Sequence, residues 1–499
     1  MNAFRRAELA LALLLCAAPA ARPQPANDPE EQARRLLEDG RAYWREGKYK
    51  QALDNYNTIV SGFSATQSVD DALLEIGRHQ ADVEQDADKA RGSFDAIAKR
   101  FPQSDSAPGA YYYLGLLALR NARGPADLED ALAQFTRVQR LYPKSEWVPR
   151  ALHAAGLVLR RGGQLEEAVE SQRRVSLEHP SSDAAAEAQF EIGHCMALLG
   201  DGARAMEEFQ QVRNRFPQAP VAAQALDRIT MLWRLTQGGR PSFGLDAGFA
   251  VGGGDLLKDV RAILMTPART LWIASDKTKS VVPFDAKGTR GPGIPAEDVR
   301  QLSLSPSGEL VVASRLAARF GAKDLRSFSV PTDKPGESQP LDRVGAVLAL
   351  PGGDTLVADD KRKRVFRFGR SGEPKGSFPD GQQREVTRMA IDSEGGIALL
   401  DADEKSVKVF DDGGKLLRAV LARGAGYELK KPADIAFDPA RNLYVAEEDQ
   451  GVLLFAPDGK LISVLSGGEE LRKLKALTLA PDGAVLVYSE RAQRVLRFQ

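Results

Sequence analysis

Cysteine and histidine are scarce in this chain of 499 residues, which contains two of the first and four of the second. Cys16 lies in an N-terminal apolar run, so a mature chain without that run keeps only Cys195 and cannot form an internal disulfide. We expect Cys195 to be a buried structural thiol on a helix. All four histidines lie before residue 200. None has the i, i+4 partner or the nearby Cys and Asp ligands that a zinc site needs, so the sequence predicts no metal site.

Net charge and long apolar runs are also absent. Lys+Arg and Asp+Glu both count 68, so the overall charge favours neither nucleic acid nor a membrane surface as a partner. No apolar run approaches the roughly 20 residues that a membrane-spanning helix needs. The chain lacks a Gly-x-Ser-x-Gly motif, a phosphate-binding loop and a close cysteine pair. We therefore predict no transmembrane segment, no cofactor and no enzymatic activity.

The N-terminus carries a short leader. Arg5 and Arg6 precede the apolar run 9–18, and small residues follow it, which is typical of a secretory signal peptide. We assign residues 1–21 to the signal peptide and 22–28 to a flexible linker, so the protein is expected to be exported and periplasmic. The sequence leaves one alternative open, in which Cys16 is a lipidated cysteine that attaches the protein to the outer membrane. The bulky Leu15 beside it fits that alternative poorly.

Helical repeats fill residues 29 to about 237, where apolar residues recur with a period of 3.6. The second helix of each of five pairs places a large side chain four residues after an alanine, and three of these helices end in an aromatic residue and proline. The pairs are Ala52/Tyr56, Ala90/Phe94, Ala131/Phe135, the polar variant Ala168/Gln172, and Ala205/Phe209. The first helices carry a glycine, at Gly40, Gly77, Gly115, Gly156 and Gly193. We expect the small residues to let helices approach and the aromatic residue to fill the gap of the next repeat.

These helix pairs resemble the tetratricopeptide repeat (TPR) family, and the aromatic-Pro endings resemble repeats of bacterial outer-membrane assembly and Tol-Pal-associated proteins. The resemblance implies a solenoid whose concave groove is lined by the first helices. The family's inward positions fall on Arg41, Trp44, Arg45, Arg78, Tyr112, Arg120, His153, Arg160, Arg161, Phe190 and His194. Arginines with aromatic residues would suit an acidic or C-terminal peptide. In the alternative interpretation, the arginines are solvated helix surface and the aromatic residues pack between repeats.

After residue 240 the apolar period changes to two, and short runs alternate with turn residues. Equivalent runs begin at Leu271, Leu310, Leu356, Ile397, Leu443 and Val485, a spacing of about 40 residues that is typical of β-propeller blades. Five third strands read Val-x2-Phe, from Val281, Val365, Val407, Val452 and Val495. This pattern resembles the NHL repeat family of six-bladed propellers. Blade two departs from it, with an expected insertion at 314–323 before Phe328.

The predicted fold is therefore an all-α TPR solenoid (29–237) followed by an all-β six-bladed propeller (238–499). The last blade lacks a fourth strand before the chain stops. We expect Ser242–Val251 to supply that strand and close the ring.

Two sets of charged residues in the propeller have alternative interpretations. Acids stand before the third strands at Asp276, Asp360, Asp401, Glu447 and Glu490. We expect them to bond turn amides, and the alternative is a metal site in the channel. A basic cluster comprises Lys361, Arg362, Lys363, Arg364 and Arg367. It is either a solvated turn or a patch for an anionic partner.

Two interaction folds without a catalytic motif predict an exported, non-enzymatic scaffold of the cell envelope. It would bind proteins or peptides through the TPR groove and a propeller face, and serve envelope assembly or maintenance. The sequence leaves two alternatives open. One is a propeller hydrolase or lyase with a divalent metal in the channel, and the other is a protein that binds cell-wall polysaccharide.

Overall fold

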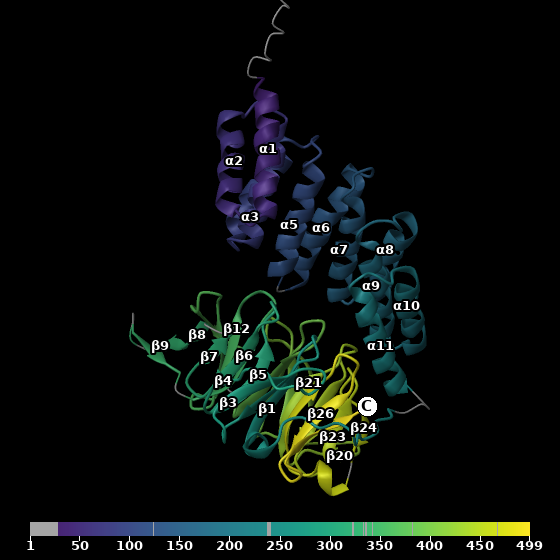
Figure 1. Cartoon of the computed structure of the whole chain (residues 1–499), viewed down its shortest axis with the longest axis vertical. Coiled ribbons are helices and arrows are strands. Elements are labelled where there is room, and N and C mark those ends of the chain that lie inside the picture. The colour runs from purple at the N-terminus through teal and green to yellow at the C-terminus, as the bar shows by residue number, and fades with distance from the viewer. Residues whose placement is uncertain are drawn as a thin grey trace, which may run out of the picture. The chain divides into compact units, whose positions relative to one another are not determined.

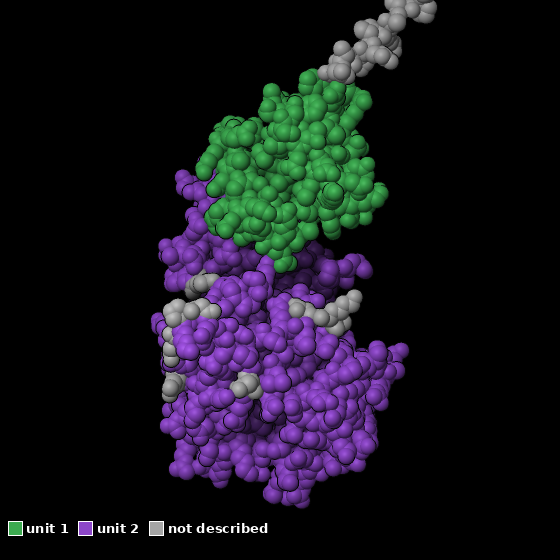
Figure 2. Space-filling view, turned by 90° about the vertical axis from the view of Figure 1, so that its left-hand side faces the viewer, with its two compact units in different colours: residues 1–110 green, residues 111–499 purple. Residues whose placement is uncertain are grey.

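The structure, a computed structural model, describes residues 28–122, 124–236, 241–321, 324–332, 334, 337–341, 343–381, 383–466 and 468–499. The predicted signal peptide, Cys16 and the linker up to residue 27 lie outside these residues. The chain divides into two compact units, unit 1 (residues 1–110) and unit 2 (residues 111–499) (Figure 2). The division falls within the helical repeats. The predicted boundary near residue 238 is instead the point at which helices give way to strands.

Eleven helices precede the first strand in the described residues (Figure 1). Unit 1 contains α1 (Pro29–Arg45), α2 (Tyr49–Gly62), α3 (Ser68–Asp82) and α4 (Ala87–Arg100), and α5 (Ala107–Asn121) crosses the division. Unit 2 continues with α6 (Pro125–Leu141), α7 (Val148–Arg161), α8 (Leu165–Glu178), α9 (Ala185–Leu198), α10 (Gly202–Arg215) and α11 (Val221–Thr236). The first ten form the five predicted pairs. None of the described helices is both long enough and apolar enough to cross a bilayer.

Each pair is held by a glycine against a large side chain. A Cβ atom on Gly77 would lie 2.5 Å from the Phe94 ring, and one on Gly115 would lie 2.6 Å from the Phe135 ring. The equivalent contacts join Gly40 to Tyr56, Gly156 to Gln172 and Gly193 to Phe209. The large side chain therefore packs against the glycine of its own repeat, whereas the sequence had suggested the next repeat. The close approach requires glycine because any larger residue would collide with the buried side chain.

Helix α11 follows the five helix pairs, and the repeat pattern in the sequence does not identify it as a separate helix. It packs on α9 and α10 and also reaches the propeller within unit 2. Met231 lies against Gly483, and a Cβ atom on Gly483 would be 2.6 Å from the Cγ of Met231. Arg234 lies 3.7 Å from the carboxylate of Asp482. The helices of unit 2 thus meet the propeller through specific contacts.

Five of the six propeller sheets have four strands, and each sheet follows the chain order from its innermost to its outermost strand. Blade 1 is β1 (Val260–Met265), β2 (Leu271–Ser275), β3 (Ser280–Phe284) and β4 (Ile294–Pro295). Blade 2 is β5 (Val299–Leu304), β6 (Leu310–Ser314), β7 (Ala318–Phe320) and β8 (Asp324–Arg326). Blade 3 is β11 (Val344–Ala349), β12 (Thr355–Asp359), β13 (Arg364–Phe368) and β14 (Pro374–Ser377).

The remaining blades repeat this order. Blade 4 is β15 (Val386–Ile391), β16 (Ile397–Asp401), β17 (Ser406–Phe410) and β18 (Leu416–Val420). Blade 5 is β21 (Pro432–Phe437), β22 (Leu443–Glu447), β23 (Gly451–Phe455) and β24 (Leu461–Leu465), and blade 6 is β25 (Leu474–Leu479), β26 (Val485–Ser489) and β27 (Arg494–Phe498). The innermost strands contact one another in sequence, and β25 also contacts β1. A separate apolar cluster fills each interface between neighbouring blades. The predicted six-bladed ring is therefore confirmed.

Blade 2 differs from its prediction. The stretch expected to be an insertion contains β7, the third strand itself, and β8 follows it. The insertion is the hairpin of β9 (Ser329–Pro331) and β10 (Ser338–Pro340), which follows blade 2. Phe328 precedes this hairpin and packs against Phe368 of blade 3, with ring centroids 4.9 Å apart. The error arose because Phe320 occupies the strand position that the pattern assigned to Phe328.

The chain ends meet at blade 6. Gly244 and Gln499 exchange two backbone hydrogen bonds of 2.8 and 2.9 Å, and the N–H of Asp246 donates to the carbonyl of Arg497 at 2.9 Å. The chain then turns at residues 247–248. The segment expected to form a fourth strand over 242–251 thus pairs with β27 over only a few residues.

Candidate functional site

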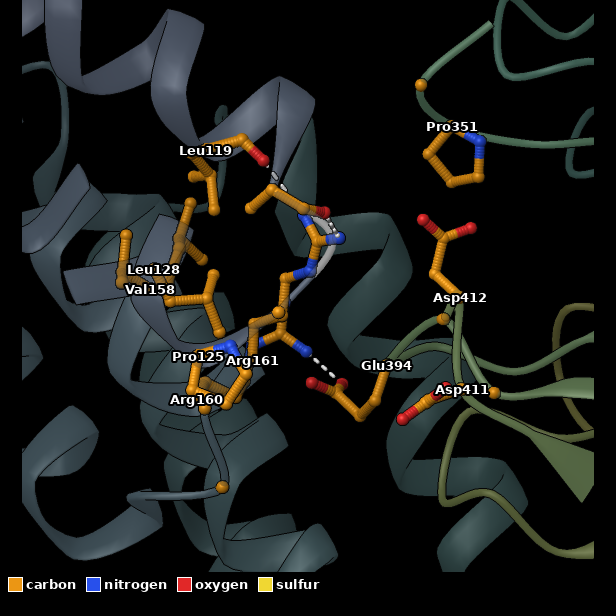
Figure 3. A pocket seen from close by; sticks show the side chains of 18 of the residues that line it. Leu119, Pro125, Leu128, Val158, Arg160, Arg161, Pro351, Glu394, Asp411 and Asp412 are labelled. Carbon is orange, nitrogen blue, oxygen red and sulfur yellow. Dashed lines mark hydrogen bonds and ion pairs between the residues drawn. The ribbon is translucent and has the colours of Figure 1, made fainter. Parts of the chain in front are cut away.

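A cleft of about 970 Å³ lies inside unit 2, between helices α5–α9 and the turns of blades 3 to 5. Its helical wall is largely apolar, and Figure 3 shows Leu119, Leu128 and Val158 on this side. Its propeller wall is formed by turns that carry Pro351, Glu394, Asp411 and Asp412 (Figure 3). The further apolar residues of the lining include Leu132, Leu157, Leu165, Leu198, Leu350, Ile391 and Leu417. A cleft of this size with one apolar wall is the usual form of a ligand site.

Arg161 caps the C-terminal end of α5 beside the cleft. It donates hydrogen bonds to the carbonyl oxygens of Leu119 and Ala122, at 2.9 and 2.7 Å. The last carbonyls of a helix lack partners within the helix, and a guanidinium satisfies them well. Arg161, predicted as a peptide-binding residue, therefore caps a helix.

A buried cluster of charges joins the helices to the propeller at the base of the cleft. Arg160 of α7 donates to Glu394, in the turn between β15 and β16, and its Nε lies 3.0 Å from Glu191 of α9. The Nε2 of His194 lies 3.7 Å from Glu394. Burial, with Arg160 and Arg228 nearby, lowers the pKa of His194 well below its usual value, so this histidine is neutral. Both Arg160 and His194 were predicted to bind a peptide, and the structure directs them to the propeller.

Glu394 makes the stability of this cluster depend on pH. Burial raises the pKa of its carboxyl to about 7 from 4.5, and Arg160 and Arg441 counteract burial only in part. The native state holds an extra proton between these values, so the free energy of unfolding falls as pH rises through the window. Replacing Glu394 with glutamine removes the titration and keeps an oxygen acceptor for Arg160. We expect the unfolding free energy of Glu394→Gln to depend less on pH than that of the wild type, as measured by urea unfolding between about pH 5 and pH 7.

An unchanged pH dependence in that variant would contradict the assignment. The proton would then be held elsewhere. Asp438 is the next candidate, because burial raises its pKa to about 6.

The propeller wall of the cleft carries an ion-pair network. Arg367 lies 2.7 Å from Asp354 and 3.1 Å from Asp412, and Lys375 lies 2.8 Å from Asp354. The Arg367 side chain is only 13% exposed. It therefore belongs to the cleft wall. The sequence analysis had instead grouped Arg367 with the exposed basic cluster 361–364.

Comparisons with known proteins identify the helices. Tetratricopeptide repeat models match residues 37–105, 83–146 and 187–219. The helical repeats are tetratricopeptide repeats. No curated protein matches the chain. Among solved structures, a streptogramin B lyase is 12% identical over 52% of this chain and 97% of its own, with a TM-score of 0.39. A selenomethionine-substituted virginiamycin B lyase from Staphylococcus aureus is 14% identical over 51% of this chain and 85% of its own, with a TM-score of 0.37.

The predicted TPR groove residues of unit 1 all contact neighbouring residues of the same unit. Arg41 lies 3.2 Å from Glu75, and Arg78 lies 2.9 Å from the same carboxylate. Trp44 stacks edge-on against His79, with centroids 5.5 Å apart. Arg45 is exposed and donates to the carbonyl of Arg41 at 3.2 Å.

In unit 2 the remaining TPR groove residues pack between helices or line the cleft. Tyr112 lies 5.4 Å from Trp147, and Phe190 lies 5.0 Å from Phe209, between ring centroids. His153 bonds Gln172 at 2.9 Å, which explains why the aromatic position is polar in that repeat. Arg120 is exposed and lines the cleft. Three of the predicted groove residues thus line the cleft, namely Arg120, Arg160 and Arg161.

The basic cluster lies at the other end of blade 3, in the turn between β12 and β13. Lys361, Lys363 and Arg364 are exposed. Arg362 pairs with the buried Asp359. The cluster is therefore a short exposed turn, remote in the blade from the residues that line the cleft.

The centre of the propeller is occupied by polar side chains. All six innermost strands carry a bulge at their second residue. The residue after each bulge is polar in blades 2, 4 and 5 and alanine in the other three, namely Gln301, Arg388 and Asp434, then Ala262, Ala346 and Ala476. Arg388 donates to the carbonyl of Arg261 in blade 1 at 3.0 Å, and its Nε lies 3.2 Å from Asp434. Gln301 bonds the backbone of Met389 at 2.5 Å. A guanidinium thus crosses the channel in which the alternative hypothesis placed a metal.

Two of the recurring acids, Asp401 and Glu447, bond turn amides as predicted, whereas the other predicted acids do not occupy the equivalent position. The second strands end at Ser275, Ser314, Asp359, Asp401, Glu447 and Ser489. Asp401 accepts from three backbone N–H groups and Glu447 from four, and the equivalent Asp359 from two. Asp276, Asp360 and Glu490 lie one residue later, because the turn after Glu447 is one residue shorter than the equivalent turns of blades 1, 3, 4 and 6.

This difference predicts unequal effects of two similar substitutions. Glu447 is fully buried, and Glu447→Ala should leave its N–H donors unpaired and cost about 2 kcal/mol of unfolding free energy. Glu490 is exposed, and Glu490→Ala should change stability by no more than about 0.5 kcal/mol. Chemical denaturation of both variants checks the pair. Equal losses would show that the spacing in the sequence, and not the strand register, identifies the structural acid.

Proposed function

We propose that this protein is a non-enzymatic scaffold that binds a segment of another protein in the cleft between its TPR helices and its propeller. The observation that carries the proposal is the fixed apolar cleft bounded by two interaction folds. Its base is held by the Arg160–Glu394 contact and by the docking of α11, so the site does not need to form on binding. Preformed sites lose less conformational entropy when a ligand binds.

The proposal includes export to the cell envelope, with a role in its assembly or maintenance. The leader pattern of the first 21 residues and the aromatic-Pro endings of the repeats support this part. The assignment of the propeller to the NHL type, from its Val-x2-Phe strands, is a further part of the proposal.

The proposed lack of enzymatic activity is supported by the channel. Arg388 places a positive charge where a divalent ion would have to bind, and like charges repel strongly at low dielectric. Among the described residues, three carboxylates close enough to share an ion are those of Asp70, Asp71 and Asp105 in unit 1. Asp71 already lies 3.5 Å from Arg41.

One observation favours the enzyme alternative. Asp360 has a buried oxygen without a hydrogen-bond partner, and burial, with Glu385 nearby, raises its pKa to about 6. Metal analysis of the purified protein decides between the two. A stoichiometric divalent ion that is lost in Asp360→Asn would contradict the scaffold proposal.

Site-specific crosslinking tests the cleft directly. A photoreactive amino acid at position 128 of the full chain, in the cells that make the protein, should give a discrete protein adduct. The same group at Lys287, an exposed turn residue of blade 1, is the control and should not. The adduct should disappear when Leu132→Glu places a charge on the apolar wall. Absence of any adduct at position 128 would overturn the proposal.

A further inference from the structure

We propose that the partner of the cleft is a short amphipathic segment with aliphatic side chains on one face and lysine or arginine on the other. This inference rests on the proposed function and specifies the chemistry of its ligand. It differs from the acidic peptide that the arginines of the TPR groove suggested.

Four arginines of the cleft lining that could attract an acidic peptide are engaged. Arg160 pairs with Glu191 and Glu394, and Arg161 caps the end of α5. Arg367 lies between Asp354 and Asp412. Arg441, also in the lining, lies 2.9 Å from Asp392. An acidic ligand would have to displace these partners, and a buried carboxylate that loses its cation is costly.

The carboxylates at the mouth of the cleft are less completely neutralised. The carboxylate of Asp411 accepts a hydrogen bond of 2.8 Å from the backbone N–H of Lys415 in the same turn. Glu129 is an exposed residue of α6 on the helical side of the cleft. Among the residues that the structure describes, no lysine or arginine forms an ion pair with either side chain. On the propeller wall, Asp354 and Asp412 pair with Arg367, and Asp354 also pairs with Lys375. A basic side chain would therefore find acceptors there without displacing an existing cation.

The apolar surfaces determine where the aliphatic face would lie. The leucines of the helical wall are half-buried, and Leu417 of β18 faces the cleft from the propeller with 48% of its surface exposed. Partly exposed leucines on both walls of one cleft are a typical mark of an interaction site. Burial of leucines would supply most of the affinity, whereas the carboxylates at the rim would mainly orient the segment and speed its association.

Model peptides test this chemistry with the full chain. The probe is a fluorescein-labelled helical peptide of leucine and lysine with its leucines on one face. The comparison peptides replace lysine with glutamate, or scramble the order of the leucine and lysine residues. We expect the amphipathic leucine–lysine peptide to bind about tenfold more tightly than either comparison peptide, measured by fluorescence anisotropy.

Variants locate the binding. Asp411→Asn combined with Glu129→Gln keeps the turn hydrogen bond but removes both charges, and should weaken leucine–lysine binding about fivefold. Leu417→Asp alters a half-exposed side chain and should weaken it at least as much. Asp403→Asn, in an exposed turn at the other end of blade 4, is the control and should leave binding unchanged.

Three results would overturn the inference. The first is equal or tighter binding of the leucine–glutamate peptide, and the second is leucine–lysine binding that none of the cleft variants alters. The third is a concentration-dependent dimer, seen by light scattering and abolished by Leu417→Asp, because the cleft would then be covered by a second copy of the chain. If no peptide binds while the crosslink at position 128 forms, this inference fails and the proposed function stands. If the crosslink is also absent, both fail.

Discussion

Replacing Gly77 with valine is expected to lower the free energy of unfolding of unit 1 by about 3 kcal/mol. A Cβ atom there would lie 2.5 Å from Cε1 and 2.8 Å from Cζ of Phe94. Phe94 is fully buried, so its ring has no space into which it can move. The collision must therefore separate α3 from α4. Hydrogen exchange of the amides in these two helices, compared between variant and wild type, measures the effect.

Gly92→Val provides a matched control in the same unit. Gly92 lies in α4, is exposed, and has open space where its Cβ would stand. Valine and glycine have similar, low helix propensities, so this change should alter stability by only a few tenths of a kcal/mol. A comparable loss in both variants would show that helix propensity, and not the contact with Phe94, explains the glycine.

The second large effect is expected when Arg160 is replaced with alanine. The change leaves Glu191 and Glu394 without their shared cation, and the side chains of these acids are only 16% and 9% exposed. Removing one partner of a buried ion pair costs about 3–5 kcal/mol. The loss should appear in unit 2, as a lower unfolding midpoint and faster hydrogen exchange in α7, α9 and the turn that carries Glu394.

Arg150→Ala is the control for that experiment. Arg150 pairs with Asp183 across neighbouring repeats, but the two side chains are 42% and 61% exposed. Exposed pairs of this kind contribute at most about 1 kcal/mol. A small effect of Arg160→Ala, similar to that of Arg150→Ala, would contradict the view that the buried cluster holds the helices against the propeller.

The sequence predicts the repeat architecture well because its determinants are local. The glycine, alanine and aromatic residues of one helix pair lie within a few tens of residues, and they contact each other in the structure. The Val-x2-Phe strands are also local patterns, in which the valine packs into the interface with one neighbouring blade and the phenylalanine into the interface with the other, as at Val365 and Phe368. Hydrophobic period and turn chemistry are sufficient to define such units.

The candidate site was less predictable because its contacts join distant segments. Glu394 follows Arg160 by 234 residues, and no spacing in the sequence links them. The arginines of the TPR groove were therefore taken as free for a ligand, although the propeller or a helix end engages Arg160 and Arg161. Among the turn-bonding acids, Asp401 and Glu447 were predicted correctly, but Asp360 was named in place of Asp359 for a different reason. Turn length varies between blades, and strand register becomes visible only when the strands are paired.

The polar side chains at the centre of the propeller also limit how this ring could change. Because Arg388 reaches the blade opposite its own, the distance across the ring is set by one side chain of fixed length. A seventh blade would widen the ring beyond that reach and leave the guanidinium without its acceptor. Because this hydrogen bond joins blade 4 to blade 1, the six units are similar in fold but are not equivalent at the centre of the ring.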